Sequence, residues 1–94
     1  LVTTDEIKNV QNLDMKLDVN EKNMQNGNTN KMIFNMNFLL SYLSKFMTLL
    51  PGDIVTTGTP PGIGNGKKPP IFLKVGDEVK LSINGLGEQK QKVK

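Results

Sequence analysis

Carboxylates, lysines and one glycine-rich loop containing threonine are the residues of this chain that could do chemistry. Its 94 residues include nine Asp or Glu and twelve basic residues, all of them Lys. Because there is no His and no Cys, these residues supply no His general base, no Cys nucleophile and no usual zinc site. The carboxylates are not paired at a spacing that marks an acid–base or metal site. The residue types alone therefore disclose no reaction and would suit a β-rich binding or structural module.

The loop at residues 56–64, with the sequence TTGTPPGIG, is the stretch best suited to touch a ligand. Its glycines let the backbone approach a ligand closely, and its prolines restrict the local geometry. Such a loop can hold backbone N–H groups and a threonine hydroxyl in fixed directions. An ordinary Gly/Pro turn after a strand has the same composition, and both interpretations stay open.

Two aspartates, Asp53 and Asp77, follow a glycine in similar stretches of sequence. Either could be a metal ligand, but a carboxylate in a Gly-Asp turn usually caps backbone N–H groups. We therefore expect two similar corners in a β structure. The polar run at 25–30, QNGNTN, is expected to form Asx-type turns, and the alternative is a loop that presents polar groups at a cleft.

The elements that must position these residues are mostly strands. Apolar and polar residues alternate over 13–19, which predicts a strand with one buried face, followed by a turn and a return strand that begins near 24. An amphipathic helix is expected at about 35–47, with Asn35 as its N-cap. Further strands are expected at 54–55, 71–73, 79–83 and 88–93. The fold class is β-rich α+β with one amphipathic helix.

Composition excludes several classes of function. Because Arg is absent and aromatic residues make up 5% of the chain, nucleic-acid binding is not expected. No apolar run approaches the roughly 20 residues that span a bilayer, so no membrane partner is expected. The hydrophobic fraction of 36% is marginal for a core, so we expect apolar surface to meet another segment or subunit. Since the chain starts at Leu1 without Met, we expect it to be a piece of a longer protein.

With its surroundings, the loop at 56–64 resembles the C-terminal part of the fumarylacetoacetate hydrolase family. The matching run is FMTLLPGDIVTTGTPPGIG at 46–64. Matching motifs follow and precede it in the family's order: KPP at 68–70, FLK at 72–74, GDEV at 76–79, and upstream DEI at 5–7, QNL at 11–13, QNGNT at 25–29 and MIF at 32–34. The resemblance therefore covers essentially all 94 residues.

This resemblance implies part of a mixed β-sandwich roll from a homodimeric, cytoplasmic enzyme, with a mitochondrial location as the alternative if the source is eukaryotic. Such enzymes act on 2-oxo or diketo acids through a metal-stabilised enolate, by C–C bond hydrolysis, decarboxylation or isomerisation. The family's Mg²⁺ or Mn²⁺ ligands, active-site Lys and His–Glu pair precede the matching region. We therefore assign no catalytic residue and no metal ligand to this chain, and expect the rest of its catalytic domain as a partner. The alternative is a catalytically silent fragment or a degenerate structural or binding module.

One site residue is carried over from the resemblance. Thr59 occupies the place of the threonine that touches the substrate carboxylate in the family's Gly-Thr loop, and the backbone of Gly58 is expected to add an N–H donor. The run from Gln25 to Thr29 is a weaker candidate for shaping the cleft. Lys31 stands where many members carry an acid, which leaves the substrate open among members labelled 2-hydroxyhepta-2,4-diene-1,7-dioate isomerase, ureidoglycolate lyase and 2,4-diketo-3-deoxy-sugar-acid hydrolase.

Overall fold

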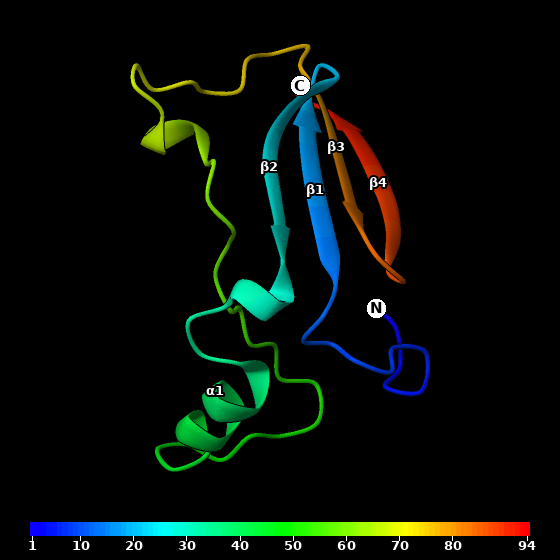
Figure 1. Ribbon diagram of the computed structural model, residues 1–94, viewed down its shortest axis with the longest axis vertical. Coiled ribbons are helices and arrows are strands. Elements are labelled where there is room, and N and C mark those ends of the chain that lie inside the picture. Colours follow the sequence, from blue (N-terminus) through cyan, green and yellow to red (C-terminus); the bar gives the residue numbers. More distant parts are fainter.

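A four-stranded antiparallel sheet with the order β2-β1-β3-β4 organises the computed structural model, which describes residues 1–94 (Figure 1). Two hairpins make the sheet, and their inner strands pair at its centre. The strands are β1 (Asp14–Val19), β2 (Lys22–Asn28), β3 (Glu78–Ile83) and β4 (Gly87–Lys92); the helices are α1 (Met36–Leu43) and the 3₁₀ turns η1 (Thr29–Lys31) and η2 (Gly64–Gly66). The expected β-rich α+β class is confirmed.

The sheet has one apolar and one charged face, as the alternation in 13–19 predicted. Met15 and Leu17 of β1 stand opposite Ile83 and Leu81 of β3 in the register, so they share what we call the inner face. The outer face carries ion pairs, listed with their N–O distances: Lys16–Asp18 at 2.9 Å, Lys80–Glu88 at 3.1 Å and Lys90–Glu78 at 2.8 Å. Because every side chain in these pairs except that of Asp18 is about half exposed, the pairs contribute little to stability.

The prediction of Asx-type turns at 25–30 is wrong over most of its length. Residues up to Asn28 continue strand β2, and only then does the chain turn into η1. Pairing with β1 gives this polar backbone a hydrogen-bonded ladder. The Asn28 side chain also donates across the strands to Asp14 Oδ1 at 2.8 Å. Tertiary pairing with a well-formed neighbour therefore outweighs the local turn preference of Asn and Gly.

Helix α1 begins where expected but ends four residues early, at Leu43 rather than at 47. Asn35 is the N-cap, and its side chain accepts from the N–H of Phe38 at 2.8 Å. At the other end, the Ser44 hydroxyl donates to the carbonyl of Ser41 at 2.9 Å. This side-chain bond competes with regular helical bonding, and the chain continues in turns.

The strands predicted at 54–55 and 71–73 do not form. After α1 the chain runs beside β2 and then crosses to β3 (Figure 1). Backbone N–H groups from 54 to 63 donate no hydrogen bond to another backbone group of the chain. A strand needs a ladder with a neighbour, and this segment lies beside the sheet without joining an edge.

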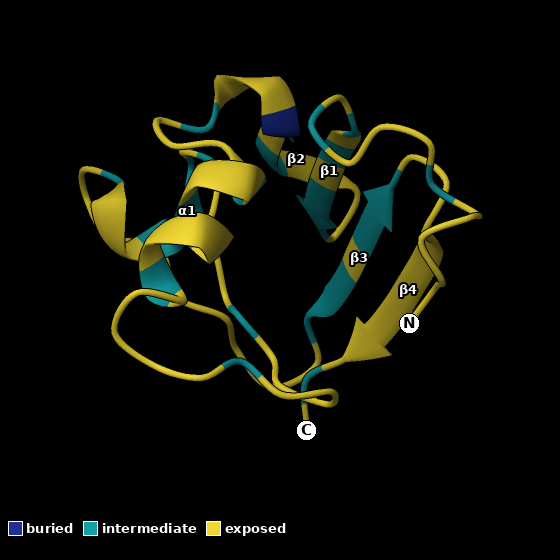
Figure 2. Cartoon of the chain, turned by 90° about the horizontal axis from the view of Figure 1, so that it is seen from below, coloured by how far each residue is buried: buried dark blue, intermediate teal, exposed yellow.

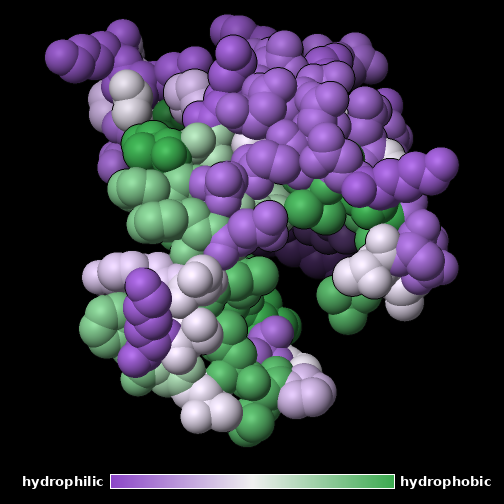
Figure 3. Space-filling view, turned by 60° about the horizontal axis from the view of Figure 1, so that its bottom comes forward, coloured by the Kyte–Doolittle hydropathy of each residue, from purple (hydrophilic) through white to green (hydrophobic).

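Very little of the chain is buried. Thr29, at 5% exposure, is the one buried residue, and it lies in η1 beside the end of β2 (Figure 2). Large apolar side chains such as Ile54 and Phe46 are 86% and 68% exposed. Apolar side chains reach the surface between the sheet and the lobe that contains α1 (Figure 3). The apolar surface expected from the composition is therefore present and open. No helix has the length and apolarity that crossing a membrane requires.

Candidate functional site

The loop that carries Thr59 is attached to the edge strand β2 through one glutamine. Gln25 Nε2 donates to Thr59 Oγ1 at 3.0 Å and to the carbonyl oxygen of Pro60 at 2.6 Å. Thirty-four residues separate Gln25 from Thr59 in the sequence. The structure thus brings the predicted site residue together with the first residue of the weaker candidate run, although that run is a strand rather than a loop.

Two glycines allow the loop to lie directly on the strand. A Cβ added at Gly62, whose φ is +109°, would stand 2.3 Å from the carbonyl oxygen of Met24. A Cβ added at Gly27 would stand 2.8 Å from Cβ of Pro60. Real Cβ atoms do not approach so closely, so a side chain at either position would push loop and strand apart. The close contact holds the backbone around Thr59 against β2.

The exposed side of the loop presents two backbone N–H groups without a partner and a hydroxyl that donates only weakly, to the Pro60 carbonyl at 3.5 Å. Thr59 is exposed, and Gly58 adopts a φ of +91° with open space where a Cβ would be. The N–H groups of Gly58 and Thr59 donate to no other backbone group of the chain. Two amides and a hydroxyl on one accessible turn can receive an anionic oxygen. This arrangement fits the expected contact with a carboxylate.

Asp53 and Asp77 cap matching corners, so the capping interpretation is confirmed. Asp53 Oδ2 accepts from the N–H of Leu50, and Asp77 Oδ2 accepts from the N–H of Lys74, each at 2.8 Å. At Asp77, a hydrogen bond from the Asn20 side chain at 2.9 Å is the main cause that lowers the pKa of the carboxyl, and the N–H of Lys74 lowers it further.

The residues of this chain do not form a site for a Mg²⁺ or Mn²⁺ ion. No group of three or more His, Cys, Asp or Glu side chains converges anywhere in residues 1–94. The carboxylates of Asp53 and Asp77 are occupied by backbone N–H groups. The donor set of this chain by itself therefore does not fit the implied cation.

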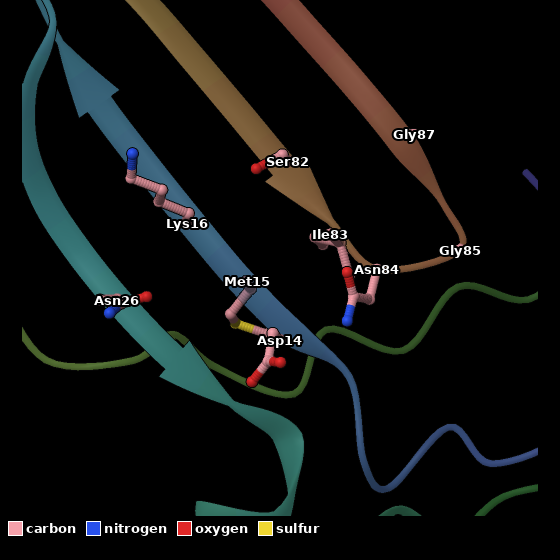
Figure 4. A pocket seen from close by; sticks show the side chains of 9 residues that line it. All are labelled: Asp14, Met15, Lys16, Asn26, Ser82, Ile83, Asn84, Gly85 and Gly87. Atoms are coloured by element: carbon pink, nitrogen blue, oxygen red, sulfur yellow. The ribbon is translucent and has the colours of Figure 1, made fainter.

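Two hollows in the surface are not lined by Thr59 itself, although Gln25 and Gly62 line the second. The first, of about 520 Å³, lies at the end of the sheet where β1 begins and β3 ends, beside Asp14 and Ser82 (Figure 4). Its carboxylate, Asp14, is already paired with the amide of Asn28. The second, of about 580 Å³, is mainly apolar, and Leu17 and Phe72 help to line it on the inner face. Neither hollow contains a cluster of three or more His, Cys, Asp or Glu side chains, and Thr59 stays the candidate on the basis of its donors.

Thr29 is a residue whose importance the sequence analysis missed. Its hydroxyl donates to the carbonyl of Val10 at 2.8 Å and accepts from the N–H of Leu13 at 2.9 Å. Gln11 extends this network, because its side chain donates to the Thr29 carbonyl and accepts from the N–H of Met36 at 2.9 Å. The network ties the N-terminal segment and the start of α1 to the end of β2. A threonine within a run of Asn and Gly gives no sequence signal of such burial.

Comparison with known proteins gives one consistent result. The whole chain, residues 1–94, matches the family model described as the fumarylacetoacetate (FAA) hydrolase C-terminal region. It is 56% identical over 94 residues to the 2,4-didehydro-3-deoxy-L-rhamnonate hydrolase of Sphingomonas sp. (strain SKA58), covering 99% of this chain and 33% of that protein.

Solved structures agree with the sequence comparison. The fumarylacetoacetate hydrolase from Exiguobacterium antarcticum superposes with a TM-score of 0.93 at 38% identity, covering 99% of this chain and 33% of that one. The maleylpyruvate hydrolase from Sphingobium sp. SYK-6, in complex with manganese(II) and pyruvate, superposes with a TM-score of 0.85 at 35% identity, with the same coverage. The chain thus spans about one third of the length of the relatives that it matches.

Proposed function

This chain belongs to the fumarylacetoacetate hydrolase family, and from that premise we propose that it forms part of an enzyme acting on a 2-oxo or diketo acid. In this proposal Thr59 and the amides of Gly58 and Thr59 bind a carboxylate of the substrate. The observation that carries the assignment is the set of available donors on a loop that is held against β2.

The relatives support the choice of substrate class and reaction. One is named as a hydrolase of a didehydro-deoxy sugar acid, at 56% identity. Another is a maleylpyruvate hydrolase whose structure holds pyruvate, itself a 2-oxo acid. We therefore propose hydrolytic cleavage of a carbon–carbon bond as the reaction. Isomerisation is the second candidate, since a structural relative from Mycobacterium abscessus is described as a probable 2-hydroxyhepta-2,4-diene-1,7-dioate isomerase, at 31% identity.

The remainder of the site is proposed to come from outside these 94 residues. A divalent cation is expected in the whole enzyme because a relative holds manganese(II), but no cluster in this chain could bind it. The open apolar surface is proposed to pack against the rest of the catalytic domain, since the relatives are about three times as long. The expected homodimer stays a prediction.

Substitution of Thr59 in the full-length protein tests the proposal. We expect Thr59→Val to weaken the binding of oxalate, a stable dicarboxylate mimic, by on the order of 1.5–3 kcal/mol, because one hydrogen bond to a charged group is lost. Isothermal titration in the presence of Mg²⁺ measures the affinity, and metal binding measured separately should not change. Thr57→Val is the matched control, because Thr57 is exposed and lies two residues away.

Two results would count against the proposal. Unchanged oxalate affinity in Thr59→Val would remove Thr59 from the site. Absence of turnover with acylpyruvates, oxaloacetate and a 2,4-diketo-3-deoxy sugar acid, together with absence of oxalate binding by the unmodified protein, would reject the substrate class.

A further inference from the structure

We propose that Gln25 is a positioning residue that directs the hydroxyl hydrogen of Thr59 toward the bound carboxylate. This inference rests on the proposed function and adds a second residue to it, from a different element. Gln25 lies on the edge strand β2, and Thr59 lies on the loop that follows α1.

The orientation of the Gln25 amide is determined by its two neighbours. Side-chain oxygen and nitrogen of glutamine are distinguished through the hydrogen-bond network. The carbonyl of Pro60, 2.6 Å away, can only accept a hydrogen bond. The amide must therefore turn its NH₂ group toward Pro60, and the same NH₂ group faces Thr59 Oγ1 at 3.0 Å. Both hydrogens of the amide are then committed to the loop.

This geometry decides what the Thr59 hydroxyl does. Because the hydroxyl accepts from Gln25, its own single hydrogen must point elsewhere. The one acceptor within reach in the chain is the carbonyl of Pro60, at 3.5 Å from Oγ1. That is far beyond the usual 2.7–2.8 Å of an O–H···O bond, so this bond is weak. A carboxylate oxygen would make a shorter, charge-assisted bond and would take the hydrogen in preference.

Gln25 is itself held in place by the strand. Its backbone pairs with Leu17 of β1, just before the register shift between Leu17 and Asp18. The Asn23 side chain bridges this irregularity, donating to the carbonyl of Gln25 at 3.2 Å and to Asp18 Oδ1 at 2.9 Å. The amide that orients Thr59 is thus presented from a paired strand, beside an irregularity that the Asn23 side chain bridges.

The competing explanation is that Gln25 only fastens the loop through Pro60. Both explanations predict that loss of the Gln25 amide weakens oxalate binding, but they differ in the role of the Thr59 hydroxyl. If Gln25 acts through that hydroxyl, its effect must disappear when the hydroxyl is absent. If it only fastens the loop, its effect must persist in Thr59→Val.

A double-mutant cycle in the full-length protein separates these explanations. The variants are Gln25→Met, which keeps the length of the side chain, Thr59→Val and their combination, with oxalate affinity measured by titration in the presence of Mg²⁺. We expect Gln25→Met to raise the oxalate Kd roughly tenfold in the unmodified background, as expected for a lost hydrogen bond. In the Thr59→Val background we expect a change of less than about twofold, since the hydroxyl to be oriented is gone.

Every other outcome of the double-mutant cycle rejects a specific part of the proposal. If Gln25→Met raises the Kd equally in both backgrounds, Gln25 only fastens the loop. If Gln25→Met does not raise the Kd in the unmodified background, Gln25 is not part of the site. Either result rejects the positioning role and leaves the proposed function standing. If Thr59→Val alone leaves the Kd unchanged, the assignment of Thr59 to the site and this inference both fail. Circular dichroism verifies that each variant folds, and Gln25→Leu, which is also uncharged and cannot donate, replaces Gln25→Met if that variant does not fold.

Discussion

Replacing Thr29 by valine tests whether the network around the one buried residue holds the chain together. Valine has nearly the shape of threonine but no hydroxyl. The substitution therefore removes the bond donated to the Val10 carbonyl and the bond accepted from the Leu13 N–H, at 2.8 and 2.9 Å, with little change in packing. Both lost partners are backbone groups, which cannot be deleted along with the hydroxyl.

The magnitude follows from how well water can reach each orphaned group. Val10 is 41% exposed, so its carbonyl can be rehydrated at little cost. Leu13 is half-buried and Thr29 is 5% exposed, so the Leu13 N–H is shielded. A shielded donor without a partner costs about 1–3 kcal/mol, and we expect the free energy of unfolding to fall by this amount. For a protein about three times as long as this chain, each kcal/mol lowers Tm by about 2 °C, the lower end of the range for large domains.

Thermal and urea unfolding of the full-length protein measure this effect. Thr29→Ser is the matched control, because it retains the hydroxyl and loses only one methyl group, worth about 0.8 kcal/mol. Thr57→Val repeats the same chemical change at an exposed position and should alter the free energy of unfolding by less than about 0.5 kcal/mol. The reasoning is refuted if Thr29→Val is as stable as the unmodified protein, or if Thr29→Ser loses as much as Thr29→Val.

Two further predictions concern the loop and one of its neighbouring corners. Gly62→Ala should destabilise the protein and weaken oxalate binding more than Gly52→Ala does. Both glycines have a positive φ, but only the Cβ at Gly62 would meet a backbone atom, the Met24 carbonyl oxygen. Equal effects of the two substitutions on thermal unfolding and on oxalate titration would show that the close contact with β2 is unimportant. Asp77→Asn should lower the free energy of unfolding at neutral pH and have little effect at acid pH. Hydrogen bonds from the Asn20 side chain and a backbone N–H lower the folded-state pKa of Asp77. The stability that the Asp77 carboxylate contributes is therefore complete above its unfolded-state pKa and disappears as the pH falls through its folded-state pKa, below about pH 4. Urea unfolding of both proteins from pH 7 to pH 3 measures this difference, and a constant gap would contradict it.

Local signals predicted several elements correctly because the forces behind them act within a few residues. The alternation at 13–19 marks β1, since every second side chain of a strand faces the core. Asn35 caps α1 because its short side chain reaches the N–H three residues ahead. The Gly-Asp corners at Asp53 and Asp77 close on themselves through a bond to the residue three positions before. Each of these needs no contact with a distant part of the chain.

The errors fall where distant contacts decide the outcome. The polar residues of β2 form a strand only because β1 offers a ladder. Conversely, the apolar residues at 54–55 and 71–73 have strand-forming side chains but no neighbour to pair with in this sheet. The pattern of apolar and polar residues in one segment does not indicate whether a partner strand is present.

The sequence by itself determined the family and the β-rich class, and it led to the prediction of Thr59 as a site residue, because these depend on residue types and on the order of motifs. Only the tertiary structure revealed that Gln25 contacts Thr59 across 34 residues and that Thr29 is the buried centre of a network. Both results depend on how β2 is placed against its neighbours. Side-chain hydrogen bonds over such separations follow from the packing of strands and loops in space, which no local pattern of residues encodes.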